Sequence, residues 1–236
     1  MTKLKKNLVV VPCYNEAKNI EPIIREIYQS SPEAHIMIVD DNSADGTAAI
    51  VKNLQKESPQ LHLIERAGKL GLGTAYLTAF RWALENGYDK VVEMDADFSH
   101  NPKVLPNIFS NLDTYPAVVG SRYTKGGGTE NWNWLRKLIS RGGSWYARTI
   151  LSMKVRDLTG GFNGWRSEVL RTINLDAIKS EGYAFQIELK YRSYQAGFQI
   201  KEIPITFSER REGQSKMSLW IVLEALLRVW KFRFAS

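Results

Sequence analysis

The strongest constraint on the fold is an alternation, over the first hundred residues, of apolar runs with segments of helical periodicity. Apolar runs begin the segments 8–14, 35–47, 61–66 and 89–97. Each run is typical of a strand that is buried on both faces. Apolar residues at helical spacing occupy the segments 15–31, 48–58 and 69–87, and Asn15 is expected to cap the first helix. This order predicts an α/β fold, in which helices flank a mostly parallel central sheet.

The second half of the chain is less regular. We expect strands at 117–123 and 198–209, helices at 134–155, 182–197 and 218–234, and irregular loops at 125–134 and 157–166. No internal repeat, low-complexity tract or linker divides the sequence. We therefore expect one domain over residues 1–236, because this length suits one sizeable core and is too short for two large domains.

The composition excludes several classes of protein. Hydrophobic residues make up 44% of the chain and charged residues 24%, which is ordinary for a globular protein and excludes a disordered one. The single cysteine, Cys13, excludes an intrachain disulfide and indicates a reducing compartment. The start, MTKLKKNLVVVPCYNE, lacks the features of a secretory signal, and no run approaches the roughly 18 apolar residues of a membrane span. We expect a cytoplasmic protein.

The net charge of +7 is unevenly distributed. Residues 1–118 hold 12 Lys and Arg against 15 Asp and Glu, whereas residues 119–236 hold 20 against 10. The second half therefore carries +10 and is expected to face an anionic partner. Nucleic acid, phosphate groups and an acidic membrane are all negatively charged and are therefore candidate partners.

Polar residues follow three of the predicted strands at the point where each strand ends. These groups are Pro12–Glu16, Asp40–Ser43 and Asp95–Asp97. In an open α/β sheet, ligands bind beyond the carboxyl ends of the strands. We therefore expect the three groups to converge on one rim, which is stronger evidence for a site than any one of them.

The sequence Asp95-Ala96-Asp97 is the most informative of these groups. Two carboxylates at a strand end can turn toward one point, and oxygen ligands of this kind suit Mg²⁺ or Mn²⁺ together with substrate phosphates. The alternative is a solvated acidic turn, since the pattern is short and common. His100, which follows closely, is expected to belong to turn structure without a chemical role.

Two other features have open interpretations. The segment 209–216, ERREGQSK, is either a phosphate-binding loop with three cations, Arg210, Arg211 and Lys216, around a glycine, or a solvated basic loop. The tail 218–234 carries a narrow polar stripe of Glu224, Arg228 and Lys231 beside a wide apolar face. It is either an amphipathic helix on a membrane surface or a helix packed on the protein's own core.

Several catalytic classes lack their motifs. The sequence GLGTA does not complete a dinucleotide fingerprint, and a P-loop, a zinc-ligand cluster and the esterase motif GxSxG are absent from the sequence. Aromatic residues do not alternate with Lys and Arg as in common RNA-binding sheets, so we expect no nucleic-acid partner.

The ordered set VPCYNEAKNI, IVDDNSADGT, KLGLGTA, MDADFSHNP, GSRY, RKLISRGG, DLTGGF and ERREGQSK resembles the polyprenol-phosphate (dolichol-phosphate) mannosyltransferases. These are inverting glycosyltransferases of family 2 with the GT-A fold. The resemblance covers residues 8–217. It implies a nucleotide-sugar-binding half at 1–118, an acceptor half at 119–216 and an amphipathic helix at 217–236.

The resemblance also implies the donor site. The guanosine part of GDP-mannose would be held by Pro12, Tyr14, Glu16, Val39 and Asp41. Asp95 and Asp97 would bind Mg²⁺ or Mn²⁺ and, together with Ala96, the diphosphate. Some relatives carry glutamine as a third metal ligand where this chain has Ser99, a weaker ligand, so water is expected to supply the third contact.

The acceptor side follows from the same resemblance. Arg122 would contact the donor or the acceptor phosphate, Arg136 and Ser140 would receive the lipid phosphate, and Arg210 and Lys216 would close over the phosphates. The catalytic group would thus comprise Asp95, Asp97, Arg122, Arg210 and Lys216. The lipid would be reached from the cytoplasm by peripheral association with the membrane, through the protein's own surface or through an anchoring partner subunit.

The expected reaction is transfer of mannose from GDP-mannose to a polyprenyl (dolichyl) phosphate with inversion. The phosphate nucleophile is already anionic near neutral pH, because its second pKa is about 6. No strong general base is therefore needed. The alternatives are a glucosyl- or other hexosyltransferase that uses the same acceptor, and a GT-A domain that binds nucleotide without catalysis.

Overall fold

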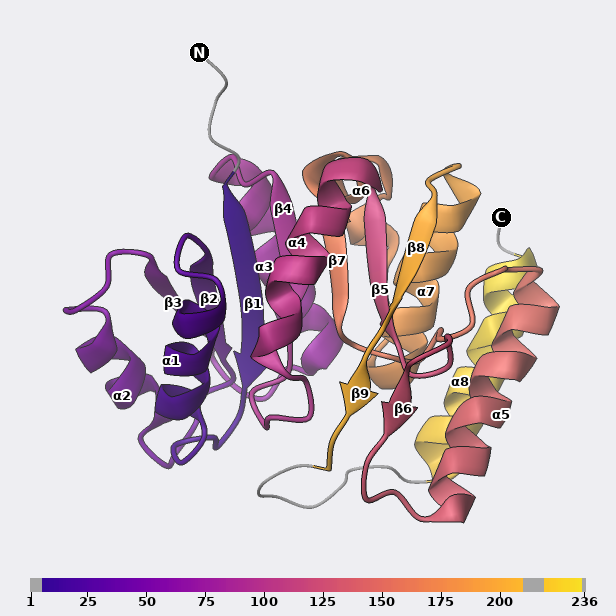
Figure 1. Ribbon diagram of the computed structural model, residues 1–236, viewed down its shortest axis with the longest axis horizontal. Helices are drawn as coiled ribbons and strands as arrows, with labels where there is room; N and C mark the ends of the chain where they lie inside the picture. Colours follow the sequence, from indigo (N-terminus) through magenta and orange to yellow (C-terminus); the bar gives the residue numbers. More distant parts are fainter. Residues whose placement is uncertain (1–5, 210–218, 235–236) are drawn as a thin grey trace.

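A seven-stranded sheet forms the centre of the protein, and helices cover both of its faces (Figure 1). The computed structural model describes residues 6–209 and 219–234, with the side chains of the last helix described from Leu227 onward. In spatial order the strands are β3 (Leu61–Glu65), β2 (His35–Asp40), β1 (Asn7–Cys13), β4 (Lys90–Glu93), β7 (Asn163–Arg166), β5 (Ala117–Ser121) and β8 (Ile200–Pro204). Only β7 runs antiparallel to its neighbours within this sheet. The predicted α/β class with a mostly parallel sheet is confirmed.

The connections between strands are mainly helical. The helices are α1 (Ile20–Ser30), α2 (Thr47–Leu54), α3 (Leu72–Glu85), α4 (Leu105–Thr114), α5 (Trp134–Leu151), α6 (Ser167–Thr172), α7 (Gly182–Gln195) and α8 (Leu219–Phe234). A separate two-stranded sheet joins β6 (Gly128–Thr129) to β9 (Thr206–Phe207). Among the described residues, no helix combines the length and the apolar character that crossing a bilayer requires.

Strand β1 shows why its apolar run is uninterrupted. Val9 and Val11 point into a core formed with α1, α2 and α4, whereas Leu8 and Val10 point into a second core formed with α3, α6 and α7. Successive side chains of a strand alternate between faces, so a strand covered on both faces needs apolar residues at every position. Burial of these residues on both faces is the main source of stability for the central sheet.

Several predictions about individual elements were wrong. The first helix begins at Ile20 instead of Asn15, because Asn15 has a left-handed backbone (φ 57°) and its side chain accepts a hydrogen bond from the Ala44 amide. Strand β4 ends at Glu93, so the two aspartates lie in the loop beyond it. The segment predicted as an irregular loop at 157–166 contains β7, which lies between β4 and β5.

The tail helix α8 packs on α5 and α7, beside which it lies in Figure 1. Val229 is 1% exposed in a third apolar cluster, together with Leu151 of α5 and Ile187 of α7. The packed alternative is therefore correct for one face of α8. The side chain of Glu224, which the predicted polar stripe includes, lies outside the described residues.

Two histidines, His35 and His62, lie side by side at the amino-terminal ends of β2 and β3. The Tyr88 hydroxyl lies 2.8 Å from Nδ1 of His35 and 3.1 Å from Nε2 of His62, and the two imidazole rings stack. Burial lowers the pKa of both histidines; the charge of Lys6 lowers the pKa of His35 further, and His35 does the same for His62. Both imidazoles are therefore neutral in the native state at neutral pH.

We predict that acid destabilises the protein partly through this pair. The folded pKa of each histidine lies below the unfolded value of about 6.5, so stability present above pH 6.5 is lost as the pH falls below it. Urea unfolding at pH 7.5 and 5.5 should give a smaller difference in unfolding free energy for His62→Gln than for the wild type. An equal difference in the two proteins would contradict this assignment.

Candidate active site

A pocket of about 380 Å³ opens at the carboxyl ends of β1, β2 and β4. The first half of the chain lines it with residues that include Pro12, Cys13, Tyr14, Glu16, Asp41, Lys69, Asp95, Ala96, Asp97 and His100. The second half contributes Arg122, Trp132, Arg136, Thr159, Gly160, Gly161, Tyr183, Gln186 and Phe207, among others. The acidic strand ends and the basic second half thus meet in one cavity, at the sheet edge where parallel strands present ligand sites.

The loop after β4 holds the two aspartates in place. The backbone amide of Asp95 donates to Nδ1 of His100 at 3.1 Å. Oδ1 of Asp97 accepts from the amide of Ser99 at 3.0 Å and from its hydroxyl at 2.5 Å. Ser99 is 1% exposed and is directed at Asp97, so it orients this carboxylate.

His100 is a buried residue that holds this loop by packing and by a hydrogen bond. It is 1% exposed and lies between the rings of Phe162 and Phe207, at centroid distances of 4.8 and 5.4 Å. Burial lowers its pKa, although the charges of Asp95 and Asp97 oppose that shift. A neutral imidazole can accept at Nδ1, and His100 does so from the Asp95 amide. His100 therefore helps to fix the shape of the loop that carries the two aspartates.

The donor atoms in this loop suit a hard divalent cation. Asp95 and Asp97 supply carboxylate oxygens, and no group of three or more His, Cys, Asp or Glu side chains within the described ranges could hold a metal by itself. Mg²⁺ and Mn²⁺ are commonly bound by one or two carboxylates with water and substrate phosphates completing the shell. The residues present therefore fit a cation that binds together with a phosphorylated substrate.

The residues expected to hold the nucleotide have different surroundings. Pro12, Tyr14, Glu16 and Asp41 line the pocket, whereas the side chain of Val39 is fully buried in the core beneath it. The Asp41 carboxylate is paired with the Arg66 guanidinium, and one of its oxygens accepts from the Leu70 amide at 3.2 Å. The ammonium of Lys69 lies 4.4 Å from the centroid of the Tyr14 ring.

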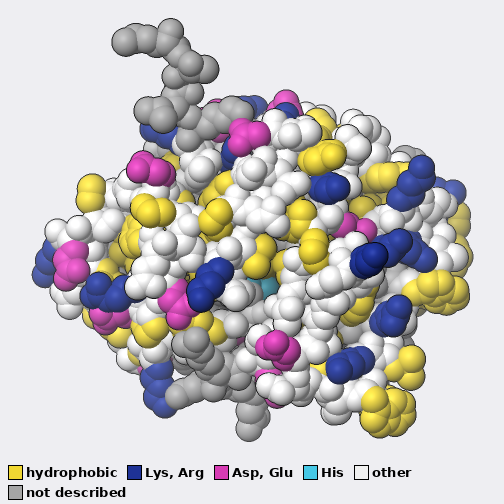
Figure 2. Space-filling view, in the orientation of Figure 1, with side chains coloured by type: hydrophobic (Ala, Val, Ile, Leu, Met, Phe, Trp, Pro, Cys, Tyr) yellow, Lys and Arg dark blue, Asp and Glu magenta, His cyan; other side chains and the backbone are white. Residues whose placement is uncertain are grey.

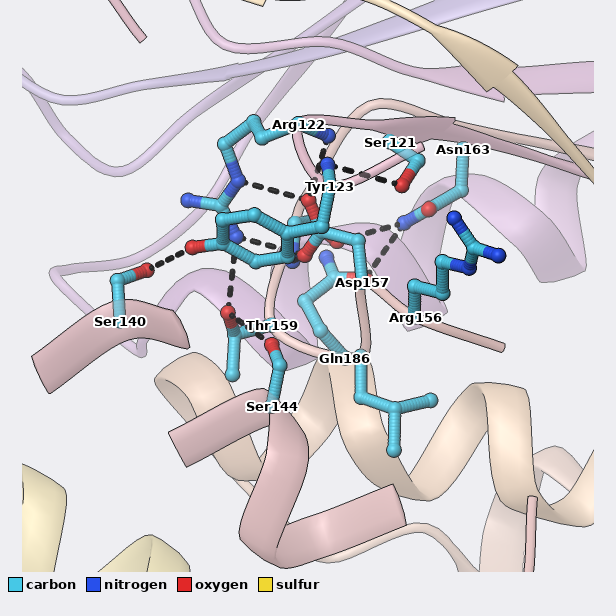
Figure 3. A network of polar contacts seen from close by, with 12 residues as sticks. Ser121, Arg122, Tyr123, Ser140, Ser144, Arg156, Asp157, Thr159, Asn163 and Gln186 are labelled. Carbon is cyan, nitrogen blue, oxygen red and sulfur yellow. Dashed lines mark hydrogen bonds and ion pairs between the residues drawn. The ribbon is translucent and has the colours of Figure 1, made fainter. Parts of the chain in front are cut away.

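A buried ion pair organises the opposite wall (Figure 3). Nε and one Nη of Arg122 donate to the two carboxylate oxygens of Asp157, each at 2.7 Å, and the same Nη donates to the Thr159 hydroxyl at 2.8 Å. Burial alone would raise the pKa of Asp157, but the charge and hydrogen bonds of Arg122 hold it below its usual value. Bidentate pairing fixes the guanidinium plane.

The same wall is joined to the core by a second set of contacts. Nε2 of Gln186 donates to Glu93 at 2.6 Å, and its Oε1 accepts from Nδ2 of Asn163 at 2.8 Å. Lys190 donates to the carbonyl oxygens of Leu158 and Gly160 at 3.2 and 2.6 Å, and burial lowers the pKa of its ammonium group. The backbone of the 157–161 loop is thus anchored from α7.

Only some of the residues predicted to contact the acceptor phosphate are found at the pocket. Arg136 lies in the first turn of α5 and lines the pocket. Ser140 lies one turn further along α5 and accepts a hydrogen bond from the Tyr123 hydroxyl at 2.7 Å (Figure 3). Ser140 is not among the residues that line the pocket. Arg210 and Lys216 lie outside the described residues.

A family model for glycosyl transferase family 2 matches residues 8–173 of the chain. The chain belongs to that family. It is 43% identical over 229 residues to the undecaprenyl-phosphate mannosyltransferase of Micrococcus luteus, covering 97% of this chain and 94% of that protein. It is 42% identical over 233 residues to the polyprenol monophosphomannose synthase of Mycolicibacterium smegmatis, covering 97% of this chain and 88% of that protein. The resemblance and the expectation of a glycosyltransferase are confirmed.

Solved structures show the same fold as this glycosyltransferase. Glucosyl-3-phosphoglycerate synthase from Mycobacterium tuberculosis, solved with Mn²⁺ and UDP among its ligands, matches with a TM-score of 0.67 at 18% identity over 98% of this chain and 80% of its own. A mannosyltransferase from Pyrobaculum calidifontis, solved with GDP-mannose and Mn²⁺, matches with a TM-score of 0.62 at 22% identity over 91% and 59%. The expected GT-A fold is confirmed.

Sequence reasoning missed several residues that line the glycosyltransferase pocket or lie directly behind its wall. Asp157, the partner of Arg122, and the wall residues Thr159 and Gly160 belong to the quoted motif DLTGGF, which was given no role. Gln186 and Trp132 carried no signal, because one lies inside an ordinary helical pattern and the other in a segment predicted as an irregular loop.

We predict that Asp157→Asn destabilises the fold by about 3–5 kcal/mol, because Arg122 would keep a buried charge without its counter-ion. Asp176→Asn is a matched control, since Asp176 is 82% exposed and pairs with Arg81 at the surface. It should change stability by about 0–1 kcal/mol. The two variants can be compared by urea unfolding, and equal effects would show that the Arg122 charge is compensated elsewhere.

Proposed function

We propose that this glycosyltransferase transfers mannose from GDP-mannose to the phosphate of a polyprenyl phosphate, with inversion at the anomeric carbon. The observation that carries the proposal is the meeting of the two halves in one pocket. Asp95 and Asp97 enter from the nucleotide-sugar half, and Arg136 enters from the basic half. Two relatives at 42–43% identity, named for mannosyl transfer to polyprenyl phosphates, support this choice of sugar and acceptor.

The reaction needs two anions to approach each other. A phosphate oxygen of the acceptor attacks the anomeric carbon as the bond from that carbon to the diphosphate breaks, and GDP leaves with the bonding electrons. Because the phosphate is already ionised, the chain needs no general base. Its task is to hold both anions in line and to reduce their repulsion, which preorganised charges in a pocket do well.

The residues of the pocket divide this task. Asp95 and Asp97 would hold Mg²⁺ or Mn²⁺, which would neutralise part of the diphosphate charge when bound. Arg136 supplies a positive charge from the start of α5, and its backbone amide is capped by Asn133 at 2.8 Å. Arg122 is already paired with Asp157, so it contributes mainly by holding the wall and less by adding free charge.

The exterior of the same half suits a lipid acceptor. Large apolar side chains are exposed on α5 (Trp134, Leu135, Leu138 and Trp145) and on α8 (Leu227, Trp230 and Phe234). Exposed cations accompany them, namely Lys137 and Arg141 on α5 and Lys231 and Arg233 on α8. Figure 2 shows apolar and basic side chains together at the right-hand end of the molecule, where α5 and α8 lie side by side in Figure 1. Aromatic and basic residues on one face are typical of a helix surface that lies on an anionic membrane.

We predict that Asp97→Asn lowers transfer by about 10²- to 10³-fold or more, because it removes a charge that stabilises the departing diphosphate. Transfer of label from radiolabelled GDP-mannose or UDP-glucose to a short prenyl phosphate, measured with Mg²⁺ or Mn²⁺, would show which donor and which metal support the reaction and whether the acceptor is used. Asp176→Asn is the surface control and should keep wild-type turnover. Wild-type turnover by Asp97→Asn would contradict the metal role, and preferred use of UDP-glucose would contradict the proposed donor.

We also predict that Leu138→Glu weakens binding to anionic vesicles, because it places a negative charge in the exposed apolar face of α5, where Leu138 is 61% exposed. Asn53→Glu adds the same charge on α2 and serves as the control. Co-sedimentation with vesicles would measure both, and turnover of a short water-soluble acceptor should stay near wild type in both. Equal vesicle binding by the two variants would contradict a membrane role for this face.

A further inference from the structure

Trp132 occupies a defined position between the small sheet and helix α5. The adjoining strand pair β6–β9 is extended by a hydrogen bond from the Glu130 amide to the Phe207 carbonyl at 2.9 Å. The Trp132 ring meets the Phe207 ring edge to face, with centroids 5.4 Å apart. Trp132 is 8% exposed and lines the pocket. A tryptophan held in this way has little freedom to turn away.

The indole ring lies beside two guanidinium groups. That of Arg136 is 4.0 Å from the ring centroid and that of Arg122 is 5.7 Å away. Cation–π attraction at 4.0 Å holds the Arg136 side chain against the pocket wall. The Arg122 charge is balanced by Asp157, whereas Arg136 has a looser contact with Glu209, at 3.7 Å, whose side chain is 55% exposed. Arg136 therefore keeps more of its charge for a ligand.

Two hydrogen-bond donors at this point have no partner among the described residues. They are Nε1 of Trp132 and Nε of Arg136, and both atoms are shielded from bulk water. An unmet donor in such surroundings is unfavourable, and most buried polar groups are paired. A ligand with several acceptor oxygens and a negative charge would satisfy both donors at once. A phosphate monoester has this chemistry.

We propose that Trp132 binds the acceptor phosphate through its indole N–H and positions Arg136 on that phosphate through its ring. This inference rests on the proposed function and adds a residue to its acceptor side. The donor diphosphate is the competing ligand, but it is expected at Asp95 and Asp97.

Trp132→Phe tests the proposal, because it keeps an aromatic ring for Arg136 and removes the N–H. With a short water-soluble prenyl phosphate, the variant should raise the KM for the acceptor by about 10- to 100-fold, as expected for losing a hydrogen bond to a charged group. The KM for GDP-mannose should stay within about twofold of wild type. Trp82→Phe makes the same change on α3, beside His62 and away from the pocket, and should leave both KM values unchanged.

An unchanged acceptor KM in Trp132→Phe would overturn the proposal, as would an equal rise in both KM values, which would indicate a general structural defect. Calorimetric titration with the prenyl phosphate, and separately with inorganic phosphate, separates this inference from the proposed reaction. If the variant binds prenyl phosphate more weakly than wild type, the result supports the subsite even if wild type transfers no mannose. If the variant also binds inorganic phosphate more weakly, the contact lies at the phosphate group. Failure of the wild type to bind prenyl phosphate would overturn both the subsite and the proposed acceptor.

Discussion

The buried ion pair between Arg122 and Asp157 is the interaction on which the site depends. It joins the end of β5 to the loop before β7, and both side chains are almost completely removed from water. Two charges are tolerated there because each satisfies the other with bidentate geometry and because Asp157 also accepts from the amides of Arg122 and Gly160, both at 3.0 Å. The pair helps to fix the backbone of this glycine-containing loop as one wall of the pocket.

The opposite wall is built by a different principle. There, the ends of parallel strands bring Tyr14, Asp41 and the Asp95–Asp97 loop together. Asp41 is held by its ion pair with Arg66, whereas uncharged side chains orient the two aspartates. Ser99 and His100 perform this task for the two aspartates without adding charge. Negative charge is thus concentrated on one wall, and on the other the cation best placed to act on a ligand is Arg136. This asymmetry suits a reaction in which one anion leaves as another arrives.

The parts of the fold that could be predicted are those set by local pattern. Successive side chains of β1 and β2 are buried on both faces of the sheet, which gives continuous apolar runs, so the strands and the polar residues at their ends were correctly located. Strand β7 was missed because its four residues, Asn163–Arg166, carry no such pattern. Its place depends on Gly164, where a Cβ atom would lie 2.6 Å from Ile108 Cγ2, and that contact involves residues far apart in sequence.

The α/β class, the rim of acidic strand ends and the basic second half follow from the amino-acid sequence, because periodicity and charge are properties of the chain. Which of the charges remain available to a ligand depends on tertiary contacts. Arg122 and Arg136 are equivalent as sequence, yet Asp157 neutralises one, while the ring of Trp132 holds the other with its charge less opposed. Likewise, the sequence of α8 is rich in apolar residues, and packing alone decided that Val229 is buried while Leu227 and Phe234 are exposed. Such choices depend on contacts between distant residues, which local pattern does not encode.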